Sequence, residues 1–583
     1  MTKPWHNSYD EGVPYTLAPY PDQTVHEILE ETASKHPQLP ACVTAPRELP
    51  VIGRPSVSIT YRQLNDLADR FAAGLAAMGV QKGDRVALMY PNSTQFVIAF
   101  FGILKAGATV VAINPTYPAP QIAQQVTDSG ARVAFCMSAL YDRMVTVRND
   151  ASTPLERIIV SNVKEYFPGL IKTLFTLATE RKDGHRIEQL DSPEDVWLQD
   201  MLSTYSASQR PSLTFTPAED VAIFQYTGGT TGVPKGARAT HKGLSTNAMQ
   251  MEAWLRSANT ASSSPSFLAA APFYHVYGLV AVLIFAVKTA APMYMVPDPR
   301  QTSEVLGMID YFKPTIYMGV PALYNAINQH PDVKAGKYDL TSIDACVSGS
   351  APLPADVKRR FEELTSGKLM EGFGMSETAV ASHCNPVNGT NKEGSIGLPL
   401  PDVDSKIMSL EDGVTELPPG EIGELVIITP SMMLGYHNMP TETANALRNG
   451  MLYTGDIAYM DEEGYFFIVD RKKDMVLIGG YNVYPNNIDK VLFGHPKIIE
   501  AAVAGIPHPE KAGQEALKAW IVVEPGETLT AEEVIAFCEE QLAPYAVPRR
   551  IEFVSELPKS TVGKILRREL IKQETEQAQI PAV

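Results

Sequence analysis

The sequence contains few cysteines, and they are not arranged to bind zinc or to form a disulfide framework. They are scattered along 583 residues and include no C-x-x-C pair. A dispersed, odd-numbered set is typical of proteins from a reducing compartment. We therefore expect no disulfide and no structural zinc site among the five, which are Cys42, Cys136, Cys346, Cys384 and Cys538.

An excess of positive charge, a signal sequence and a long apolar segment are also missing. The net charge of −17 argues against nonspecific nucleic-acid binding. The N-terminal residues MTKPWHNSYDEG lack a basic segment followed by an apolar one. The longest apolar run, LVAVLIFAV at 279–287, is too short to span a bilayer and predicts a buried helix. We expect a cytoplasmic protein, and peripheral contact with the inner face of a membrane stays open.

No G-x-G-x-x-G follows the first predicted strand, which argues against a dinucleotide-dependent oxidoreductase. Instead, helices and short apolar strands alternate. A helix with apolar residues at helical spacing is predicted within 59–79, and strands follow at 85–90 and 109–113. Similar strands are predicted at 221–226, 267–271, 315–319 and 344–348. This alternation predicts an α/β fold with buried parallel sheets, in which ligands bind beyond the C-terminal ends of strands.

The composition changes after about residue 395. Short β-like segments with proline and glycine turns, such as 417–430, predict a small barrel or distorted sheet. From about 473 the pattern becomes compact α+β, with a strand at 519–523 and a capping-box helix start at 530–533. We expect a large domain, 1–472, of two βαβ-type sheets plus a small β-barrel. A small, mobile α+β domain, 473–583, follows.

A loop rich in glycine and threonine, QYTGGTTGVPKGA at 225–237, follows one predicted strand. Glycines let the backbone approach a ligand, while threonine hydroxyls and Lys235 suit phosphate oxygens. On local composition alone, an ordinary turn is the favoured interpretation. The loop also differs from the common nucleotide loop, because Pro234 rather than glycine precedes Lys235.

Six further segments occur after this loop: APFYHVYGL (271–279), SGSAPL (348–353), EGFGMSET (371–378), YTGD (453–456), DRKKDMVLIGGYNVYP (470–485) and PKSTVGKI (558–565). In this order and spacing, the seven segments resemble the core motifs of the acyl-adenylate-forming (AMP-binding) superfamily, from about residue 20 to about 575. Within it, the chain looks most like bacterial long-chain fatty-acid–CoA ligases. The resemblance implies ATP, Mg²⁺ and CoA as cofactors and a fatty acid as substrate. The carboxylate would attack the α-phosphorus of ATP to give acyl-AMP and pyrophosphate, and the CoA thiol would then expel AMP.

The resemblance assigns roles around the phosphates and the metal. Glu377 and Thr230 would bind Mg²⁺, since a hard cation takes oxygen ligands. Ser376 stands where the family usually has threonine and would contact the α-phosphate. Alone, Glu377 would be interpreted as a surface acid. The residues assigned to the phosphates are Thr227, Gly228, Gly229, Thr230, Thr231, Gly232 and Lys235.

The resemblance also assigns the adenosine and CoA contacts. Asp456 and Arg471 would bind the ribose hydroxyls. From its local sequence alone, Asp456 would be interpreted as a turn residue and Arg471 as a solvated charge. Phe373 would stack on adenine where tyrosine is frequent in the family. The remaining residues assigned to nucleotide and CoA are Gly349, Ser350, Ala351, Glu371, Gly372, Gly374, Gly479, Gly480 and Tyr481.

Lys564, Glu377 and His275 are the predicted catalytic residues. Lys564 would bridge the carboxylate and the α-phosphate, although a lone lysine near a C-terminus is more often a surface charge. His275 would flank the carboxylate, although a lone histidine is more often structural. The acyl-binding residues implied by the resemblance are His275, Tyr277, Gly278, Gly319, Val320 and Pro321.

Several alternatives stay open. APFYHVYGL also resembles aryl-acid ligases, so a medium-chain or aryl-acid CoA ligase is the nearest rival. A peptide-synthetase adenylation unit is disfavoured, because no carrier domain is expected after Lys564. An inactive adenylate-binding or membrane-docking protein is the non-enzyme alternative, and a homodimer is open. Asn487 stands where the family commonly has glutamate. Lys473 matches the family's pivot, about which the small domain would rotate between half-reactions.

Overall fold

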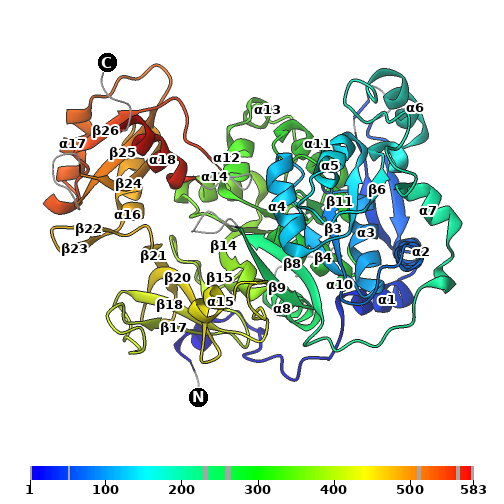
Figure 1. Ribbon diagram of the computed structural model, residues 1–583. Coiled ribbons are helices and arrows are strands. Elements are labelled where there is room, and N and C mark those ends of the chain that lie inside the picture. The colour runs from blue at the N-terminus through cyan, green and yellow to red at the C-terminus, as the bar shows by residue number, and fades with distance from the viewer. Residues whose placement is uncertain are drawn as a thin grey trace. The chain divides into compact units, whose positions relative to one another are not determined.

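The computed structural model describes residues 3–46, 48–49, 53–227, 234–256, 264–508, 514–559 and 565–578. The chain divides into two compact units. The large unit comprises Met1–Asp404 and Ile428–Leu452, and the small unit comprises Ser405–Ile427 and Tyr453–Val583. Figure 1 shows the elements of both with their labels. No helix in the described ranges is long and apolar enough to cross a membrane.

A nine-stranded sheet forms one half of the large unit. Its middle strands, from β14 to β1, are all parallel, while β2, β15 and β16 pair antiparallel. The strand order is β16 (Leu398–Pro399), β15 (Val380–Cys384), β14 (Lys368–Met375), β13 (Ala345–Ser348), β12 (Ile316–Gly319), β10 (Phe267–Ala269), β11 (Met293–Met295), β1 (Pro40–Thr44) and β2 (Val57–Thr60).

A seven-stranded sheet forms the other half. Every pair in it is parallel except β8 with β9. The order is β7 (Val196–Trp197), β6 (Arg157–Ser161), β5 (Val133–Met137), β3 (Arg85–Met89), β4 (Thr109–Ala112), β8 (Val221–Thr227) and β9 (Lys235–Thr240). The predicted parallel α/β architecture is therefore confirmed, and the strands predicted from short apolar runs are present within a residue or two of their expected bounds.

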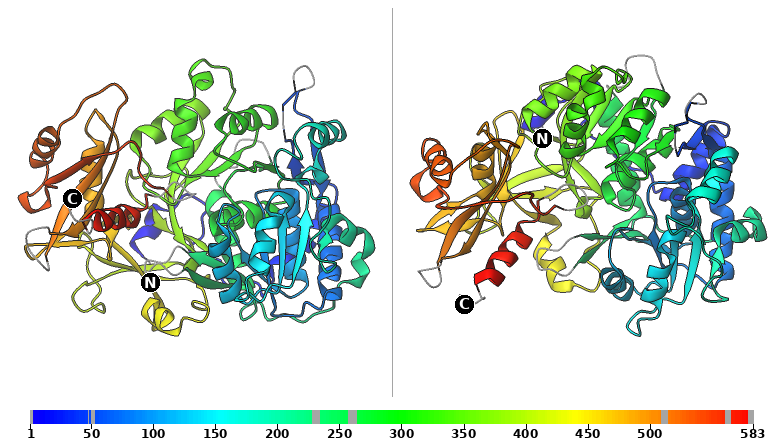
Figure 2. Two further views of the ribbon diagram at one scale, coloured as in Figure 1. Left: turned by 45° about the horizontal axis from the view of Figure 1, so that its top comes forward. Right: turned by 90° about the horizontal axis from the view of Figure 1, so that it is seen from above.

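Helices cover both faces of these sheets (Figure 2). Side chains of α4 and α5 pack with the seven-stranded sheet, and side chains of α11, α12 and α14 pack with the nine-stranded one. The helices around the two sheets are α1 (Val25–Lys35), α2 (Tyr61–Ala77), α3 (Thr94–Lys105), α4 (Ala119–Ser129), α5 (Tyr141–Arg148), α6 (Gly169–Ala178), α7 (Leu198–Thr204), α8 (His241–Leu255), α11 (Thr302–Phe312), α12 (Pro321–Gln329), α13 (Pro331–Lys334) and α14 (Ala355–Thr365).

Two helix predictions are confirmed in detail. In α2 the side chains of Leu64, Phe71 and Leu75 are fully buried, as their helical spacing predicts. The apolar run at 279–287 is a buried helical segment made of a π-helical turn, η6 (Leu279–Ile284), and α10 (Phe285–Lys288).

A five-stranded sheet follows the parallel sheets in sequence, where a small barrel or distorted sheet is predicted. Its path is β17 (Asp404–Met408), β18 (Gly423–Ile428), β20 (Met451–Met460) and β19 (Leu447–Arg448), with β21 (Phe466–Arg471) also paired to β20. The short helix α15 (Pro440–Ala446) directly precedes β19.

The last part of the chain is α+β, as predicted. The hairpin β22 (Val476–Ile478) and β23 (Tyr481–Val483) precedes a sheet of β24 (Ile498–Pro507), β25 (Glu515–Val523) and β26 (Arg550–Phe553). Helices α16 (Pro485–Phe493), α17 (Ala531–Glu539) and α18 (Arg567–Ala578) belong to the same unit. The capping box predicted at the start of α17 is present, because Thr530 accepts a hydrogen bond from the backbone N–H of Glu533.

Candidate active site

Three neighbouring parallel strands of the large unit end beside one another, and the predicted nucleotide and acyl residues lie at these ends. In register, Gly319 of β12 is opposite Ser348 of β13, and Ser348 is opposite Glu371 of β14. The structure therefore gathers at one sheet edge the residues Gly319, Val320, Pro321, Gly349, Ser350, Ala351, Glu371, Gly372, Phe373, Gly374, Ser376 and Glu377.

Tyr277 holds the ends of β12 and β13 together. Its hydroxyl lies 2.7 Å from the carbonyl oxygen of Val347 and 3.2 Å from that of Gly319. The N–H of Gly349 also donates to the carbonyl of Gly319, at 3.2 Å. Burial raises the pKa of Tyr277 well above its usual value, so the phenol stays a neutral donor. Tyr277 thus joins the predicted acyl residues to the predicted adenine segment.

His275 begins the short helix α9 (Val276–Gly278), which ends with Gly278. Its Nδ1 accepts a hydrogen bond from the N–H of Tyr277 at 3.2 Å, so the proton of the neutral ring is on Nε2. Burial lowers the pKa of His275 to about 4. At neutral pH this imidazole can donate a hydrogen bond to a carboxylate oxygen, but it carries no positive charge.

Glu377, the predicted metal ligand, is buried in the turn η7 (Ser376–Thr378). The hydroxyl of Tyr436 donates to its Oε1 at 2.6 Å. Lys235, the first residue of β9, places its Nζ 5.3 Å from the centre of the Tyr436 ring. Tyr436 therefore connects the lysine of the glycine-rich loop to the acid of the EGFGMSET motif.

Backbone hydrogen bonds fix this arrangement from two sides. The N–H of Met433 donates to the carbonyl of Glu377 at 2.8 Å. In β9, the N–H of Arg238 donates to the carbonyl of Gly435 at 3.0 Å. The segment 433–437 is thus paired to both η7 and β9, and Tyr436 has little freedom to leave Glu377.

Two further residues of the motif at 371–378 are shaped by close packing. A Cβ on Gly374 would lie 1.4 Å from the carbonyl oxygen of Val380, so no other residue fits there. The ring of Phe373 meets that of His383 edge to face, with centroids 6.0 Å apart. An aromatic ring is therefore held at this edge without a tyrosine hydroxyl.

In the small unit, Asp456 and Arg471 form an ion pair. They lie opposite one another in β20 and β21, and the Nε of Arg471 is 2.6 Å from the Oδ1 of Asp456. The Asp456 carboxylate is 2% exposed, whereas the Arg471 side chain is 32% exposed. The structure thus brings together the two residues predicted to bind a ribose.

Gly479, Gly480 and Tyr481, which the resemblance assigns among the nucleotide and CoA contacts, lie at the tip of the β22–β23 hairpin. Gly479 and Gly480 have φ values of 58° and 88°, as a tight two-residue turn between twisted strands requires. Tyr481 follows directly and is 58% exposed. Asn487 lies in the first turn of α16 and is exposed, so its difference from the family pattern leaves no gap in the core.

Several predicted residues lie outside the described part of the chain. These are Gly228, Gly229, Thr230, Thr231, Gly232 and Lys564. Thr227 ends β8, where it pairs with Lys235 of β9. Their assignments to phosphate, metal and catalysis stay predictions.

Tyr436 is the contact that the sequence motifs do not indicate. It lies 59 residues after Glu377 in an unremarked segment, GYHN, and no local spacing relates the two. Among the described residues, no group of three or more His, Cys, Asp and Glu side chains could hold a metal ion. A cation beside Glu377 would therefore need oxygen ligands beyond a cluster of carboxylates in the described chain.

Comparison with known families agrees with this geometry. The AMP-binding enzyme family matches residues 29–437, and the AMP-binding enzyme C-terminal domain matches residues 487–564. The chain belongs to the AMP-binding enzyme family. Within this family, the two matched regions contain the candidate sites of the strand ends and of Lys564, respectively.

Relatives in the AMP-binding enzyme family align along almost the whole chain. A long-chain-fatty-acid–CoA ligase of Bacillus subtilis (strain 168) is 39% identical over 579 residues, covering 98% of each chain. One from Escherichia coli O6:H1 is 34% identical over 571 residues, again covering 98% of each.

Solved structures of related enzymes share the fold. ATP-bound MatB from Rhodopseudomonas palustris superposes with a TM-score of 0.79 at 27% identity, covering 96% of this chain and 100% of that one. The anthranilate CoA ligase AuaEII, in complex with anthranoyl-AMP, gives 0.80 at 27% identity, covering 97% and 99%.

Proposed function

We propose that the protein is an ATP-dependent, AMP-forming long-chain fatty-acid–CoA ligase. The observation that carries this proposal is the 39% identity, over 98% of both chains, to a ligase of that name. The local geometry supports it, because Lys235, Tyr436 and Glu377 form one connected group at the ends of the parallel strands.

In the first half-reaction, the large unit binds the fatty acid and ATP. Lys235 faces phosphate oxygens, where a cation stabilises the charge that builds on them. His275 donates from Nε2 to a carboxylate oxygen, which positions the acid without a charge. Lys564 supplies the second cation, between the carboxylate and the α-phosphate.

The residues at Glu377 fit a magnesium site. The carboxylate is buried, and the hydroxyl of Tyr436 fixes its orientation through Oε1, as hydrogen-bond donors to metal-binding side chains commonly do. A bound Mg²⁺ would neutralise phosphate charge, with Glu377 and Thr230 as its protein ligands.

In the second half-reaction, residues of the small unit hold acyl-AMP and border the path of the CoA thiol. Asp456 and Arg471 hold the ribose of acyl-AMP, because a carboxylate accepts hydrogen bonds from both hydroxyls. The hairpin tip with Gly479, Gly480 and Tyr481 borders the path of the thiol. We propose that residues 473–583 act as a lid domain that turns about Lys473 between the two half-reactions.

A pyrophosphate-release assay over saturated acids of increasing chain length tests this function. We expect release that depends on the acid and rises with chain length, since each buried methylene contributes about 0.8 kcal/mol. Acyl-CoA should form only when CoA is added. Absence of acid-dependent release would refute the ligase and favour the inactive adenylate-binding protein.

A medium-chain or aryl-acid CoA ligase is the alternative substrate class. The solved anthranilate CoA ligase has the same fold at 27% identity. Testing benzoate and anthranilate in the same assay distinguishes the fatty-acid ligase from this alternative. Faster turnover of an aryl acid than of hexadecanoate would decide for the alternative.

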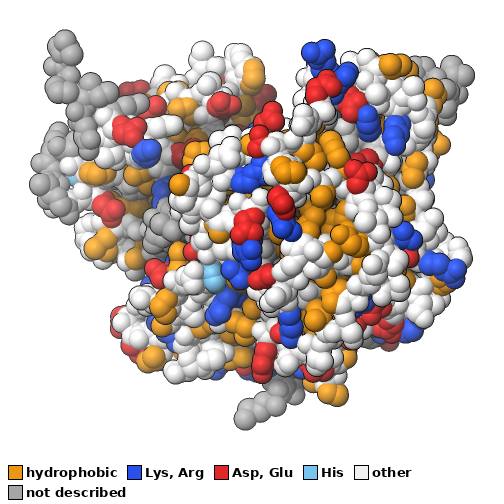
Figure 3. All heavy atoms as spheres, turned by 45° about the vertical axis from the view of Figure 1, so that its right-hand side comes forward, with side chains coloured by type: hydrophobic (Ala, Val, Ile, Leu, Met, Phe, Trp, Pro, Cys, Tyr) orange, Lys and Arg blue, Asp and Glu red, His pale blue; other side chains and the backbone are white. Residues whose placement is uncertain are grey.

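Peripheral membrane contact is proposed through α6. Leu170, Leu174 and Leu177 recur at helical spacing and are 53%, 47% and 81% exposed. The other apolar side, with buried Ile171 and half-buried Phe175, packs inward. On the face drawn in Figure 3, apolar side chains lie among basic and acidic ones. Such a stripe suits the headgroup boundary of an anionic bilayer.

Flotation with phosphatidylglycerol vesicles tests this contact. Leu170→Glu and Leu177→Glu should each reduce the bound fraction, while Leu39→Glu, at another exposed leucine, should not. Equal binding by all variants would exclude α6 as the docking surface. A homodimer stays a prediction, which sedimentation velocity of the same protein would test.

A further inference from the structure

The β22–β23 hairpin is too small to order its own tip. It has two strands of three residues each, and such a hairpin is marginal in water without other packing. Its base is anchored, because Val476 and Val483 are each 2% exposed and belong to the core cluster of the small unit. Leu477, in contrast, is 55% exposed. Ile478, next to the tip, is only partly buried against this cluster, so the core holds the base of the hairpin firmly and its tip less firmly.

A stacked aromatic pair fixes the other end. The ring of Tyr481 lies flat on the ring of Tyr545, with centroids 4.4 Å apart and planes 8° from parallel. Tyr545 belongs to a separate element, the 3₁₀ turn η8 (Pro544–Ala546), which packs against β23. Val547, the residue that follows η8, is buried in the same core cluster. Tyr545 is thus a rigidly mounted surface against which the tip rests.

The stack of Tyr481 on Tyr545 orders the hairpin tip and contributes little to the rest of the unit. Tyr481 is 58% exposed and Tyr545 40% exposed, so the stack adds little to the buried core. Gly479 and Gly480 precede Tyr481 and bring no side chains that could order the turn. Removing Tyr545 would leave the fold intact and would free Gly479, Gly480 and Tyr481 to move.

We propose that Tyr545 is a positioning residue for thioester formation, acting through Tyr481. This inference rests on the proposed ligase function, in which the hairpin tip borders the path of the CoA thiol. Aromatic stacking orders the tip before CoA arrives, so the thiol path is preformed. Adenylation uses other residues and does not depend on this contact.

Two variants and one control separate these effects. Tyr545→Ala removes the stack, and Tyr545→Phe keeps the ring while deleting the hydroxyl. Phe553→Ala removes a comparably exposed aromatic ring, 41% exposed, from β26 of the same unit. Each protein is assayed in single turnover for acyl-AMP formation from hexadecanoate and ATP, and separately for consumption of hexadecanoyl-AMP by CoA.

We expect Tyr545→Ala to slow the CoA step about three- to tenfold, in line with the worth of an aromatic pair, and to leave adenylation unchanged. Tyr545→Phe should restore the rate, and Phe553→Ala should match the wild type in both steps. Amide hydrogen exchange across 476–483 should accelerate in Tyr545→Ala alone.

Three results would overturn the inference. An unchanged CoA step in Tyr545→Ala shows that the stack has no positioning role, and equal loss in both steps shows a structural role only. A wild-type protein inactive in both half-reactions refutes the proposed function and this inference with it. Failure of the inference alone is recognised by a wild-type protein that completes both steps.

Discussion

The hydroxyl of Tyr436 lies 2.6 Å from Oε1 of Glu377, and its ring lies below the Nζ of Lys235, 5.3 Å away. One side chain therefore orients the proposed metal ligand and also contacts the lysine proposed to bind phosphate. These two groups belong to motifs far apart in the sequence, and the fold brings both of them to the same tyrosine.

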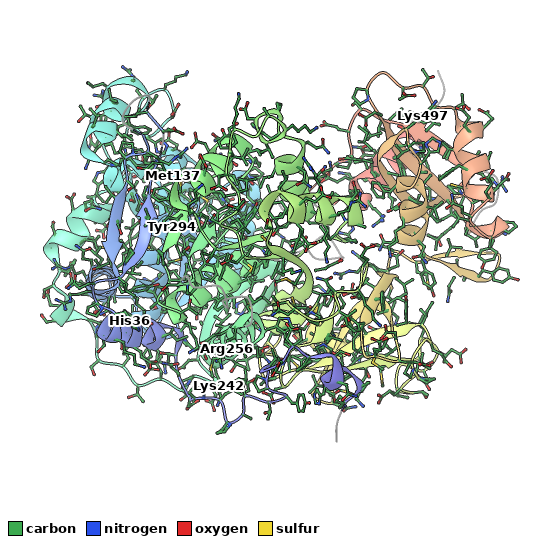
Figure 4. The ribbon with its side chains drawn as sticks, turned by 180° about the vertical axis from the view of Figure 1, so that it is seen from behind. His36, Met137, Lys242, Arg256, Tyr294 and Lys497 are labelled. Atoms are coloured by element: carbon green, nitrogen blue, oxygen red, sulfur yellow. The ribbon has the colours of Figure 1, made fainter. Side chains whose placement is uncertain are left out.

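Tyr436→Phe tests the first of these contacts. We expect the Mg²⁺ concentration for half-maximal pyrophosphate release to rise about tenfold, because losing the partner of a metal ligand commonly costs 10–100-fold in affinity. Tyr294→Phe is the matched control, since Tyr294 (labelled in Figure 4) lies in β11 and stacks on Phe312. An unaltered Mg²⁺ dependence in Tyr436→Phe would separate this tyrosine from the metal.

Glu377→Gln should have a larger effect in the same titration. A neutral amide is a poor ligand for a hard cation, so excess Mg²⁺ should restore activity only in part. If Glu377→Gln and wild type share one Mg²⁺ curve, Glu377 is not a metal ligand.

Lys235→Ala should lower kcat/KM for ATP about 10- to 100-fold, because a charge-assisted hydrogen bond contributes about 1.5–3 kcal/mol. Lys242→Ala is the control. Lys242 (Figure 4) follows β9 and pairs with Asp22 at 3.3 Å, at the surface. Equal ATP kinetics in both variants would remove Lys235 from the phosphate site.

The strands and helices of the large unit could be predicted because the spacing of apolar residues along each segment indicates which side chains are buried. Runs such as VAIFQY become strands whose central residues, here Ala222–Gln225, are buried, and the i, i+3, i+4 spacing at 64–75 becomes the inner face of α2. Thr530 and Glu533 specify their own helix start through side-chain and backbone hydrogen bonds. These signals need no information from distant residues.

The positions of Tyr436 and Tyr545 could not be predicted in this way. Each acts on a partner brought to it by the fold, and neither lies within a turn or a strand pair of that partner. The two compact units are also discontinuous in sequence, whereas a change in composition suggests a single cut. The boundary between 472 and 473 stays a prediction about motion, and the site residues stay predictions about ligands.

Acid should destabilise the protein through histidines that the fold keeps neutral. Burial lowers the pKa of His275 and His241 to about 4 and of His383 to about 3. In the unfolded chain these groups titrate at about pH 6.5, so between that pH and about 4 only the unfolded state takes up the protons. Their stabilising contribution is complete above about pH 6.5 and is lost as the pH falls.

Urea unfolding between neutral and acidic pH measures this loss. Each histidine contributes up to about 1.4 kcal/mol per pH unit within its window. His241→Gln should flatten the dependence relative to wild type, since one proton-linked group is removed. An identical slope in the variant would show that His241 is not buried as a neutral group.

The two half-reactions should be separable at Lys564 and at Lys473. Lys564→Ala should cripple acyl-AMP formation, because the cation at the α-phosphate is lost, and should leave CoA able to consume supplied acyl-AMP. Lys473→Pro should do the reverse, because proline fixes φ and resists rotation.

The turn that contains Lys473 determines which control the Lys473→Pro variant needs. Lys473 is the third residue of a turn closed by a hydrogen bond from the N–H of Asp474 to the carbonyl of Arg471, at 2.9 Å. A proline there fixes φ inside this closed turn, so thermal unfolding must show that the variant folds. Lys473→Gly is the matched control, since it removes the same side chain while leaving the backbone free, and it should retain both half-reactions. Loss of both steps in equal proportion in Lys473→Pro and Lys564→Ala would show that no rotation about Lys473 separates them.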